Sequence, residues 1–267
     1  MWEMLLLPLL GLLIGTVAAL TGIGGGVFIV PILTLLYSFS PANAAGTSHT
    51  TIVFTALAAT LIYSRQRRIS YRTGLLLAVV TAPGGFLGVY LTTVLPAKLL
   101  GVFFGFFVII FVALPMSIDP HSLRLKRFFT SRDDKCALKP DELFFSSSRK
   151  MLFGAVLSFL SGIASGLLGI GGGVLLVPIL TLVADMPIHF AAATSLFTIT
   201  FTSTSEAVQH YFAKQINFEY ALLLALGAVL GAQVGASVSK KTSGKNLRRI
   251  FGLVVVIVGI QMILKYI

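Results

Sequence analysis

Two glycine-rich runs are the part of this chain best suited to hold a ligand. Residues 21–26 read Thr-Gly-Ile-Gly-Gly-Gly, and residues 168–173 read Leu-Gly-Ile-Gly-Gly-Gly. Glycine adopts positive φ angles freely, so such a run lets the backbone turn its N–H groups toward an anion at close range. A helix that begins after each run would point its positive end at the same place, which favours a small oxyanion as the ligand. The predicted binding residues of the runs are Gly22, Gly24, Gly25, Gly26, Gly169, Gly171, Gly172 and Gly173.

Hydroxyl side chains recur after both runs. Thr47 and Ser48 occupy the same place in the first half of the chain as Thr194 and Ser195 do in the second. Because hydroxyls donate hydrogen bonds, we add these four residues to the predicted substrate site. The alternative is that they cap the start of a helix, which is a common role of serine and threonine.

Two titratable residues lie inside apolar stretches, where a charge is costly and is by default a functional candidate. His49 directly follows Ser48, and Glu206 follows a stretch rich in threonine and serine at 200–205. We predict that at least one of them carries the proton if the chain moves its ligand in a proton-linked way. For Glu206 the alternative is a place near the end of its helix, in water or paired with Lys214.

Other classes of site fit these residues poorly. A dinucleotide-binding loop needs a third glycine where Val27 stands, and a soluble strand–helix unit around it. The single cysteine, Cys136, can form neither an internal disulfide nor a thiolate metal cluster. Scattered serines with His49 or His210 make a weak case for an enzyme in the membrane. We therefore expect no enzymatic activity, no cofactor and no metal. For the glycine runs, the alternative to ligand binding is close packing of helices through small residues.

The elements that position these residues are predicted to be membrane helices. Of the 267 residues, 56% are apolar and only 11% are charged, whereas a soluble domain has about 25% charged residues. The net charge of +11 comes from basic residues in short runs between apolar segments, a pattern of membrane proteins that we do not take for nucleic-acid binding. The apolar N-terminal stretch lacks a basic start and recurs at 152–168, so we expect mature structure there and not a signal peptide.

Ten apolar segments are expected, and two of them, 27–37 and 174–184, are too short to cross a hydrocarbon core of about 30 Å at about 1.5 Å per residue. The segments run roughly over 4–20, 27–37, 47–63, 73–94, 99–116, 151–167, 174–184, 194–211, 220–238 and 249–266.

The chain repeats itself at an offset of 147 residues. The sequence Pro-Ile-Leu-Thr-Leu at 31–35 recurs at 178–182, and Gly84 matches Gly231 in a helix where small residues allow close packing. Residues 1–116 and 151–267 are thus predicted to be two transmembrane repeats. A polar cytoplasmic linker at 117–150 joins them.

Basic residues favour opposite orientations of the two repeats. If the repeats are inverted, loops 63–72, 117–150 and 239–249 share one side and hold 17 of the 20 lysines and arginines. A parallel arrangement would place 14 of these lysines and arginines on that side and would leave the basic cluster at 239–249 on the opposite side of the membrane. Inversion needs an odd number of crossings per repeat, so each glycine run must be the turn of a hairpin. The predicted fold is an all-α integral membrane protein with two inverted-topology repeats and glycine-broken hairpin helices.

The paired Gly-Ile-Gly-Gly-Gly runs, each with Pro-Ile-Leu five residues further on, resemble the TauE/SafE family of sulfite exporters and related anion permeases. The resemblance covers nearly the whole chain except the linker. It implies sulfite, a sulfonate or another small sulfur oxyanion as the substrate, moved by a secondary mechanism. Members of the family differ in substrate and direction.

We therefore predict a secondary transporter of small sulfur-containing oxyanions in the bacterial cytoplasmic membrane, with export as the expected direction and proton coupling as an option. The alternative is an anion channel of the same fold without proton coupling, which would lack saturable, proton-dependent flux. The expected partners are a small inorganic or organosulfur anion and the lipid bilayer, with no nucleic acid. The oligomeric state is left open.

Labelling can test the inverted topology. Cys136 is first replaced, and single cysteines are then placed at Arg68 and at Lys241. We expect an impermeant thiol reagent to reach both positions only from the cytoplasmic side, because their loops share one face in the inverted arrangement. Labelling of the two positions from opposite sides would contradict inversion.

Overall fold

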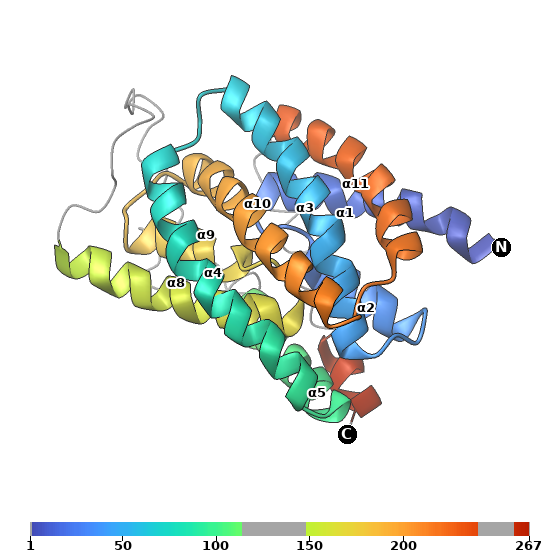
Figure 1. Cartoon of the computed structure of the whole chain (residues 1–267). Helices are drawn as coiled ribbons and strands as arrows, with labels where there is room; N and C mark the ends of the chain where they lie inside the picture. The colour runs from blue at the N-terminus through green and yellow to red at the C-terminus, as the bar shows by residue number, and fades with distance from the viewer. Residues whose placement is uncertain (1, 114–147, 240–258, 267) are drawn as a thin grey trace.

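A computed structural model describes residues 2–113, 148–239 and 259–266 (Figure 1). Most of the predicted linker, at 117–147, lies outside these residues, as do Cys136 and the basic residues of 240–249. The described part of the chain is helical and contains no strand. The all-α fold predicted from the sequence is therefore confirmed.

The helices of the two halves correspond. The starts of α2, α3 and α4 lie 147 residues before those of α9, α10 and α11, and the left-handed residues Ser38 and Asp185 recur at the same offset. The helices are α1 (Trp2–Thr21), α2 (Gly26–Leu35), α3 (Pro41–Arg65), α4 (Tyr71–Val94), α5 (Ala97–Val108), a π-helical turn (Ile109–Ala113), α8 (Ser148–Leu168), α9 (Gly173–Leu182), α10 (Ile188–Phe212) and α11 (Phe218–Val238).

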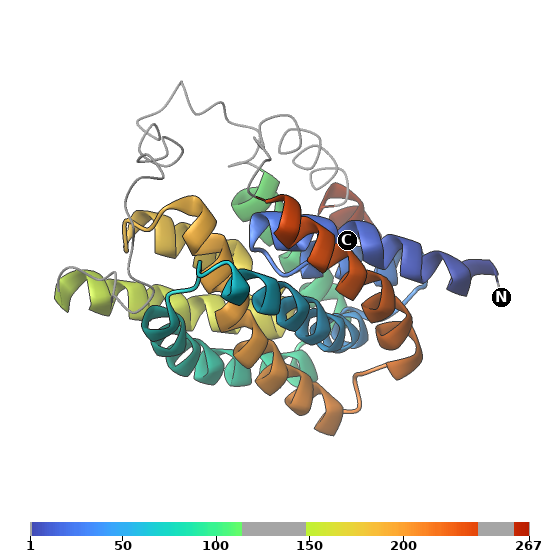
Figure 2. The ribbon, with the colours of Figure 1, turned by 90° about the horizontal axis from the view of Figure 1, so that it is seen from above.

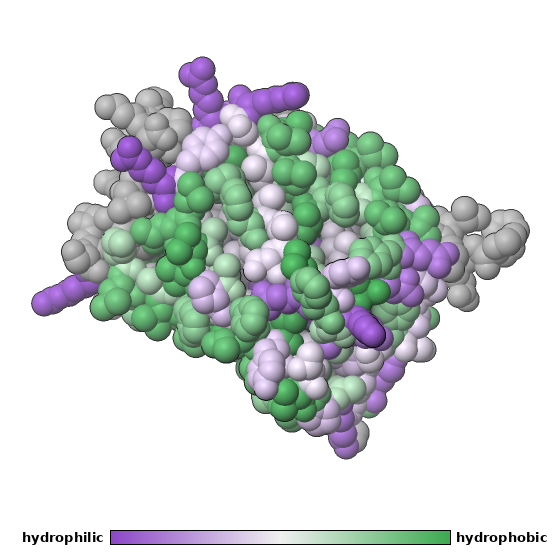
Figure 3. Space-filling model, viewed as in Figure 1, coloured by the Kyte–Doolittle hydropathy of each residue, from purple (hydrophilic) through white to green (hydrophobic). Residues whose placement is uncertain are grey.

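Helix lengths and surface chemistry indicate a multi-pass membrane protein. Among the described helices, α3, α4, α8 from Arg149 onward and α11 are long and apolar enough to span a bilayer. The helices α2 and α9 have 10 residues each, so the prediction that these segments cannot cross is confirmed. Apolar side chains cover much of the face in Figure 3, while hydrophilic ones gather mainly toward its margins. Such a surface suits contact with lipid.

Two central helices lie between two helix pairs. Helix α1 packs along α11, and α4 packs along α8, so each pair joins one helix from each half (Figure 1). Helices α3 and α10 pack against each other, and each also contacts one of the outer pairs, α3 at α11 and α10 at α4. The view from above in Figure 2 shows the same arrangement. The centre of the molecule is thus built from α3, α10 and the two glycine runs.

Glycines set the spacing inside the outer pairs. A Cβ atom on Gly231 would lie 2.0 Å from the carbonyl oxygen of Leu12, and one on Gly84 would lie 2.2 Å from that of Phe159. Only a residue without a side chain allows backbones to approach this closely. The packing role predicted for Gly84 and Gly231 is confirmed.

We expect Gly231→Ala to destabilise the protein. Alanine favours a helix over glycine by about 1 kcal/mol, but the new methyl group would meet a backbone carbonyl that cannot turn away, and overpacking of this kind costs about 1–3 kcal/mol. Thermal unfolding of the detergent-solubilised protein measures the balance. The control is Leu230→Ala, at a neighbouring side chain that is 57% exposed. A Gly231→Ala protein that is more stable than the parent would show that α1 and α11 can separate at little cost.

Candidate functional site

The two glycine runs form the turns that precede the short helices. Gly25 caps α2 with φ 96°, and Gly172 caps α9 with φ 71°. Any other residue would be strained in this left-handed conformation, by roughly 1–2 kcal/mol. The carbonyl of Gly25 accepts the N–H groups of Phe28 and Ile29. The N–H groups that come before them have no partner within the helix, as at every helix start.

The two turns lie against each other. A Cβ atom on Gly26 would lie 2.1 Å from the carbonyl oxygen of Gly169, and one on Gly173 would lie 2.5 Å from that of Gly22. The N-termini of α2 and α9 therefore meet in the centre of the molecule. The structure brings both glycine runs together in one place, and their role in binding substrate stays a prediction.

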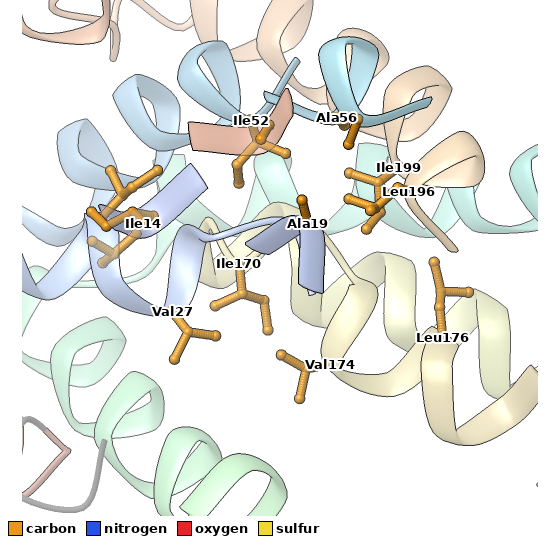
Figure 4. Packing of buried hydrophobic residues seen from close by; sticks show 14 of the residues in the cluster. Ile14, Ala19, Val27, Ile52, Ala56, Ile170, Val174, Leu176, Leu196 and Ile199 are labelled. Atoms are coloured by element: carbon orange, nitrogen blue, oxygen red, sulfur yellow. The ribbon is translucent and has the colours of Figure 1, made fainter. Parts of the chain in front are cut away.

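Apolar side chains cover the place where the turns meet. Ile52 of α3 and Ile199 of α10 both lie within 4 Å of the Cβ position at Gly24 and of that at Gly171. Figure 4 labels both of them, with Ile199 beside Leu196, together with Ile170 of the second turn. This central place is closed by side chains in the described conformation.

The predicted serines hold the turns of the opposite half. Ser48 Oγ donates to the carbonyl oxygen of Gly169 at 2.8 Å, and Ser195 Oγ donates to that of Gly22 at 3.0 Å. Both serines are fully buried. Each central helix therefore fixes the turn that belongs to the other half of the chain.

The predicted threonines bind backbone N–H groups of the other half. Thr47 Oγ1 accepts from the N–H of Asn217 at 3.1 Å, and Thr194 Oγ1 accepts from that of Ser70 at 3.1 Å. The alternative of helix capping is wrong for all four hydroxyl residues. The central helices start earlier than the apolar pattern indicated, at residues 41 and 188, and Ser40 caps the first of them through a hydrogen bond from Asn43 N.

His49 and Glu206, predicted separately, form one buried pair. Nδ1 of His49 lies 3.1 Å from Oε2 of Glu206, and both side chains are fully buried. Ser165 of α8 contacts both residues, because its carbonyl oxygen lies 3.0 Å from His49 Nε2 and its hydroxyl donates to Glu206 Oε2 at 3.0 Å. The alternative that Glu206 pairs with Lys214 at the helix end is wrong.

The 3.1 Å contact between His49 Nδ1 and Glu206 Oε2 limits the proton states of this pair, although Nδ1 has no hydrogen-bond partner of good geometry among the described residues. A carbonyl oxygen can only accept, so His49 Nε2 must carry a hydrogen and donate it to Ser165. The contact between His49 Nδ1 and Glu206 then holds one proton, either on the carboxyl group or on the imidazole. Without that proton two lone pairs would face each other.

Four further polar residues at or near the pair were not in the predicted site: His210, Gln215, Ser161 and Ser165. Ring centroids of His210 and His49 lie 5.4 Å apart in a stack, and His210 Nδ1 lies 2.6 Å from Oε1 of Gln215. Ser161 Oγ donates to the carbonyl oxygen of Gly172 at 3.0 Å. Two sequence signals could have found these residues. His210 follows Glu206 by one helical turn, and Ser161 and Ser165 are spaced on one face of an apolar helix.

A cavity of about 700 Å³ lies elsewhere, at the groove between α1 and α11. It is lined by apolar residues, including Leu12, Phe54 and Leu226. None of the predicted site residues lines it. An apolar groove beside two outer helices suits an acyl chain better than an anion.

Comparisons with known proteins agree over the length of the chain. A family model described as sulfite exporter TauE/SafE matches residues 7–262. A probable membrane transporter protein of Bacillus subtilis, YunE, is 33% identical and covers 97% of this chain and 96% of its own length. A probable membrane transporter protein of Methanocaldococcus jannaschii is 27% identical, and the match covers 98% of this chain and 97% of that protein. The sulfite exporter TauE/SafE family protein 6 of Arabidopsis thaliana is 26% identical, and the match covers 45% of this chain and 28% of that protein. No solved structure matches.

We expect Ser48→Ala and Ser195→Ala each to lower stability by about 1–3 kcal/mol, since each leaves a buried carbonyl oxygen without a donor. Denaturant titration of the solubilised protein measures the loss. Ser237→Ala is the matched control, because that exposed hydroxyl bonds only within its own helix. If either variant is as stable as the control, the hydroxyls do not hold the turns.

Proposed function

This chain belongs to the sulfite exporter TauE/SafE family, and we propose that it moves small sulfur oxyanions, such as sulfite or a sulfonate, across the bacterial cytoplasmic membrane. Relatives over the full length carry the description of membrane transporters. We propose export as the direction and a secondary mechanism as the energy source, as expected from the sequence.

The observation that carries this proposal is the meeting of two helix N-termini at the glycine turns. Each helix end presents roughly half a positive charge, so two ends together balance about one negative charge. The described lysines and arginines lie at helix ends or in connections, away from these turns. An anion there must be neutralised by backbone N–H groups, because an uncompensated buried charge is prohibitive. A monoanion is therefore the preferred substrate.

Ile52 and Ile199 give this site its access control in the proposed mechanism. Both side chains lie over the two turns, so an anion reaches the N–H groups only when α3 and α10 move relative to the turns. The serine hydrogen bonds to Gly22 and Gly169 tie each central helix to the opposite turn. Movement of one half is then transmitted to the other.

The order of contacts between the central helices supports the inverted repeat. His49, near the start of α3, contacts Glu206 near the end of α10. Further along α3, Thr60 lies 3.3 Å from Thr200, which comes earlier in α10. Equivalent helices thus run in opposite directions past each other. In a membrane such helices belong to repeats of opposite orientation, the usual design for alternating access.

The buried His49–Glu206 pair supports proton coupling. It lies next to the second turn, because Ser165, which binds Glu206, also lies 3.5 Å from the Cβ position at Gly172. A second proton taken up by the pair would add a positive charge beside an anion bound at this turn. Protonation and anion binding would then favour each other. A channel of the same fold would need no such pair.

Flux in proteoliposomes tests the proposed function. We expect saturable flux of sulfite or of an alkylsulfonate, with a rate that follows the monoanion when sulfite is titrated through its second ionisation. Gly25→Leu and Gly172→Leu should abolish flux while membrane insertion persists, because each position requires a left-handed φ and the new side chain would displace the turn. It would press on Ile14 of α1 at Gly25 and on Ser161 and Ser165 of α8 at Gly172. Leu160→Ala, at a side chain 51% exposed on α8, is the control.

Unchanged flux with both glycine variants would assign the glycines to packing alone. A rate that follows the sulfite dianion would contradict the charge balance between two helix ends. Unsaturable flux that ignores a pH gradient would favour the channel.

A further inference from the structure

The connections that follow the two central helices are built on one plan. They comprise residues 66–70 after α3 and residues 213–217 after α10, at the repeat offset of 147. In the first connection, Ser70 N donates to Thr194 Oγ1 of α10 at 3.1 Å. In the second, Asn217 N donates to Thr47 Oγ1 of α3 at 3.1 Å. Each connection is therefore bound to the start of the opposite central helix.

A side chain at the same place in each connection reaches the end of another helix. Arg68 Nη1 lies 3.5 Å from Oγ of Ser239, the residue that caps the end of α11. In the other half, Gln215 Oε1 accepts from Thr92 Oγ1 of α4 at 2.9 Å. Arg68 is the repeat equivalent of Gln215, and Ser239 is that of Thr92. Because α3 and α10 run in opposite directions, a cation lies at one end of the central pair and a neutral amide at the other.

The Arg68 connection lies close to the first glycine turn. The threonine of α10 that binds the connection, Thr194, is followed by Ser195, whose hydroxyl donates to the carbonyl oxygen of Gly22 at 3.0 Å. A second contact leads to the same turn, because the hydroxyl of Tyr63 near the end of α3 donates to the carbonyl oxygen of Ala19 at 2.8 Å. Ala19 precedes Gly22 by three residues. The start of α10 therefore lies between this connection and the turn.

The charge of Arg68 is not neutralised within the described part of the chain. Its side chain is half-buried, whereas the other arginines of the loop at 63–72 are exposed. Its hydrogen bond to Ser239 is long, and the ion pairs formed by described residues do not include it. Lys150, by contrast, is paired with Asp185 at 2.6 Å. A guanidinium group has five N–H donors, so Arg68 has donors to offer to a ligand.

The chemistry of this side chain fits the proposed substrate. A guanidinium group binds oxyanions through parallel N–H···O bonds and is more weakly hydrated than an ammonium group. A positive charge at a half-buried position also raises the local concentration of anions. At the other end, the amide oxygen of Gln215 is occupied by Thr92 and lies 2.6 Å from Nδ1 of His210. That end therefore offers an anion no equivalent attraction.

We propose that Arg68 is a capture site for the sulfur oxyanion, from which the anion passes to the glycine turns when the start of α10 moves. In the topology predicted from the basic residues, the Arg68 connection is the cytoplasmic entrance and the Gln215 connection is the outer exit. The site binds the anion before the turns do and takes no part in neutralising it there. This inference rests on the proposed function and adds a binding residue and a difference in affinity between the two faces.

Exchange of labelled sulfite in membrane vesicles of both orientations tests the capture site. The vesicles are loaded with saturating unlabelled sulfite, and the concentration of labelled sulfite outside is varied. Inside-out vesicles then report the cytoplasmic face, and right-side-out vesicles report the outer face. We expect Arg68→Gln, which introduces the residue of the second half, to raise the half-saturating concentration at the cytoplasmic face about tenfold, because the attracting charge is lost. The maximal exchange rate and the outer face should be nearly unchanged.

Two further variants and a salt series separate capture from a structural role. Arg65→Gln is the matched control, since it removes an exposed charge from the same loop and should leave both faces unchanged. Arg68→Lys keeps the charge without the planar fork, so its half-saturating concentration should fall between those of the parent and Arg68→Gln. In the parent, added salt should weaken binding more steeply at the cytoplasmic face than at the outer face, because it screens the Arg68 charge.

Three results with Arg68→Gln would overturn the proposal. These are an unchanged half-saturating concentration at the cytoplasmic face, a rise that Arg65→Gln reproduces, and an equal rise at both faces. If Arg68→Gln does not reach the membrane, an equal salt dependence at the two faces of the parent would overturn it instead. A parent protein that exchanges sulfite in neither orientation would refute the proposed function itself, whereas exchange by the parent with any of the other results would refute only the capture site.

Discussion

Everything in this structure depends on how a broken helix can be tolerated inside a membrane. Lipid offers no hydrogen bonds, so each backbone group freed by the glycine turns must find a partner in the protein. The carbonyl oxygens of Gly22 and Gly169 find theirs in Ser195 and Ser48, and that of Gly172 finds Ser161. The N–H groups at the starts of α2 and α9 have no partner within their own helices and also need one. In the proposed function a bound anion is the partner of these N–H groups, so a break that is costly for stability is useful for binding.

The same hydrogen bonds make the two halves inseparable. The turn of one half is held by the central helix of the other, and both outer pairs combine a helix from each half at backbone contact. Neither half could therefore bury its own turn alone. A shift of α3 therefore moves the glycine turn before α9. Helix α9 packs against α10, and α10 holds the glycine turn before α2. In the proposed transport cycle, opening on one side would be coupled mechanically to closing on the other through these packed elements.

The sequence was informative where the signal is local. Runs of glycine, ten-residue apolar stretches and the 147-residue offset are all visible in the chain, and the structure contains the short helices that they predict. The start of α3 was missed because the residues after Pro41 are small or polar, and apolarity reports burial in lipid and not the helix itself. The pairing of His49 with Glu206 joins residues 157 positions apart, and no local pattern encodes such a contact. His210 was set aside because its value depends entirely on the partners that the fold supplies.

The buried titratable residues occur at only one of two places that the repeat makes equivalent, and a fully symmetric scaffold would lack this difference. Two equivalent repeats would give an inward-open and an outward-open state of similar energy, and a proton gradient can bias them only through a group that binds protons differently in each. Such a group must be present once, since two copies related by the symmetry would exchange roles and cancel. Glu206, His49 and His210 stand at one of the two equivalent places, with Ala59, Leu196 and Tyr63 at the other. When α3 and α10 move relative to each other, the contact between His49 and Glu206 changes, whereas the equivalent residues Leu196 and Ala59 carry no titratable group. In the proposed mechanism, this departure from symmetry is the feature by which a repeat fold would convert a proton gradient into directed anion flux.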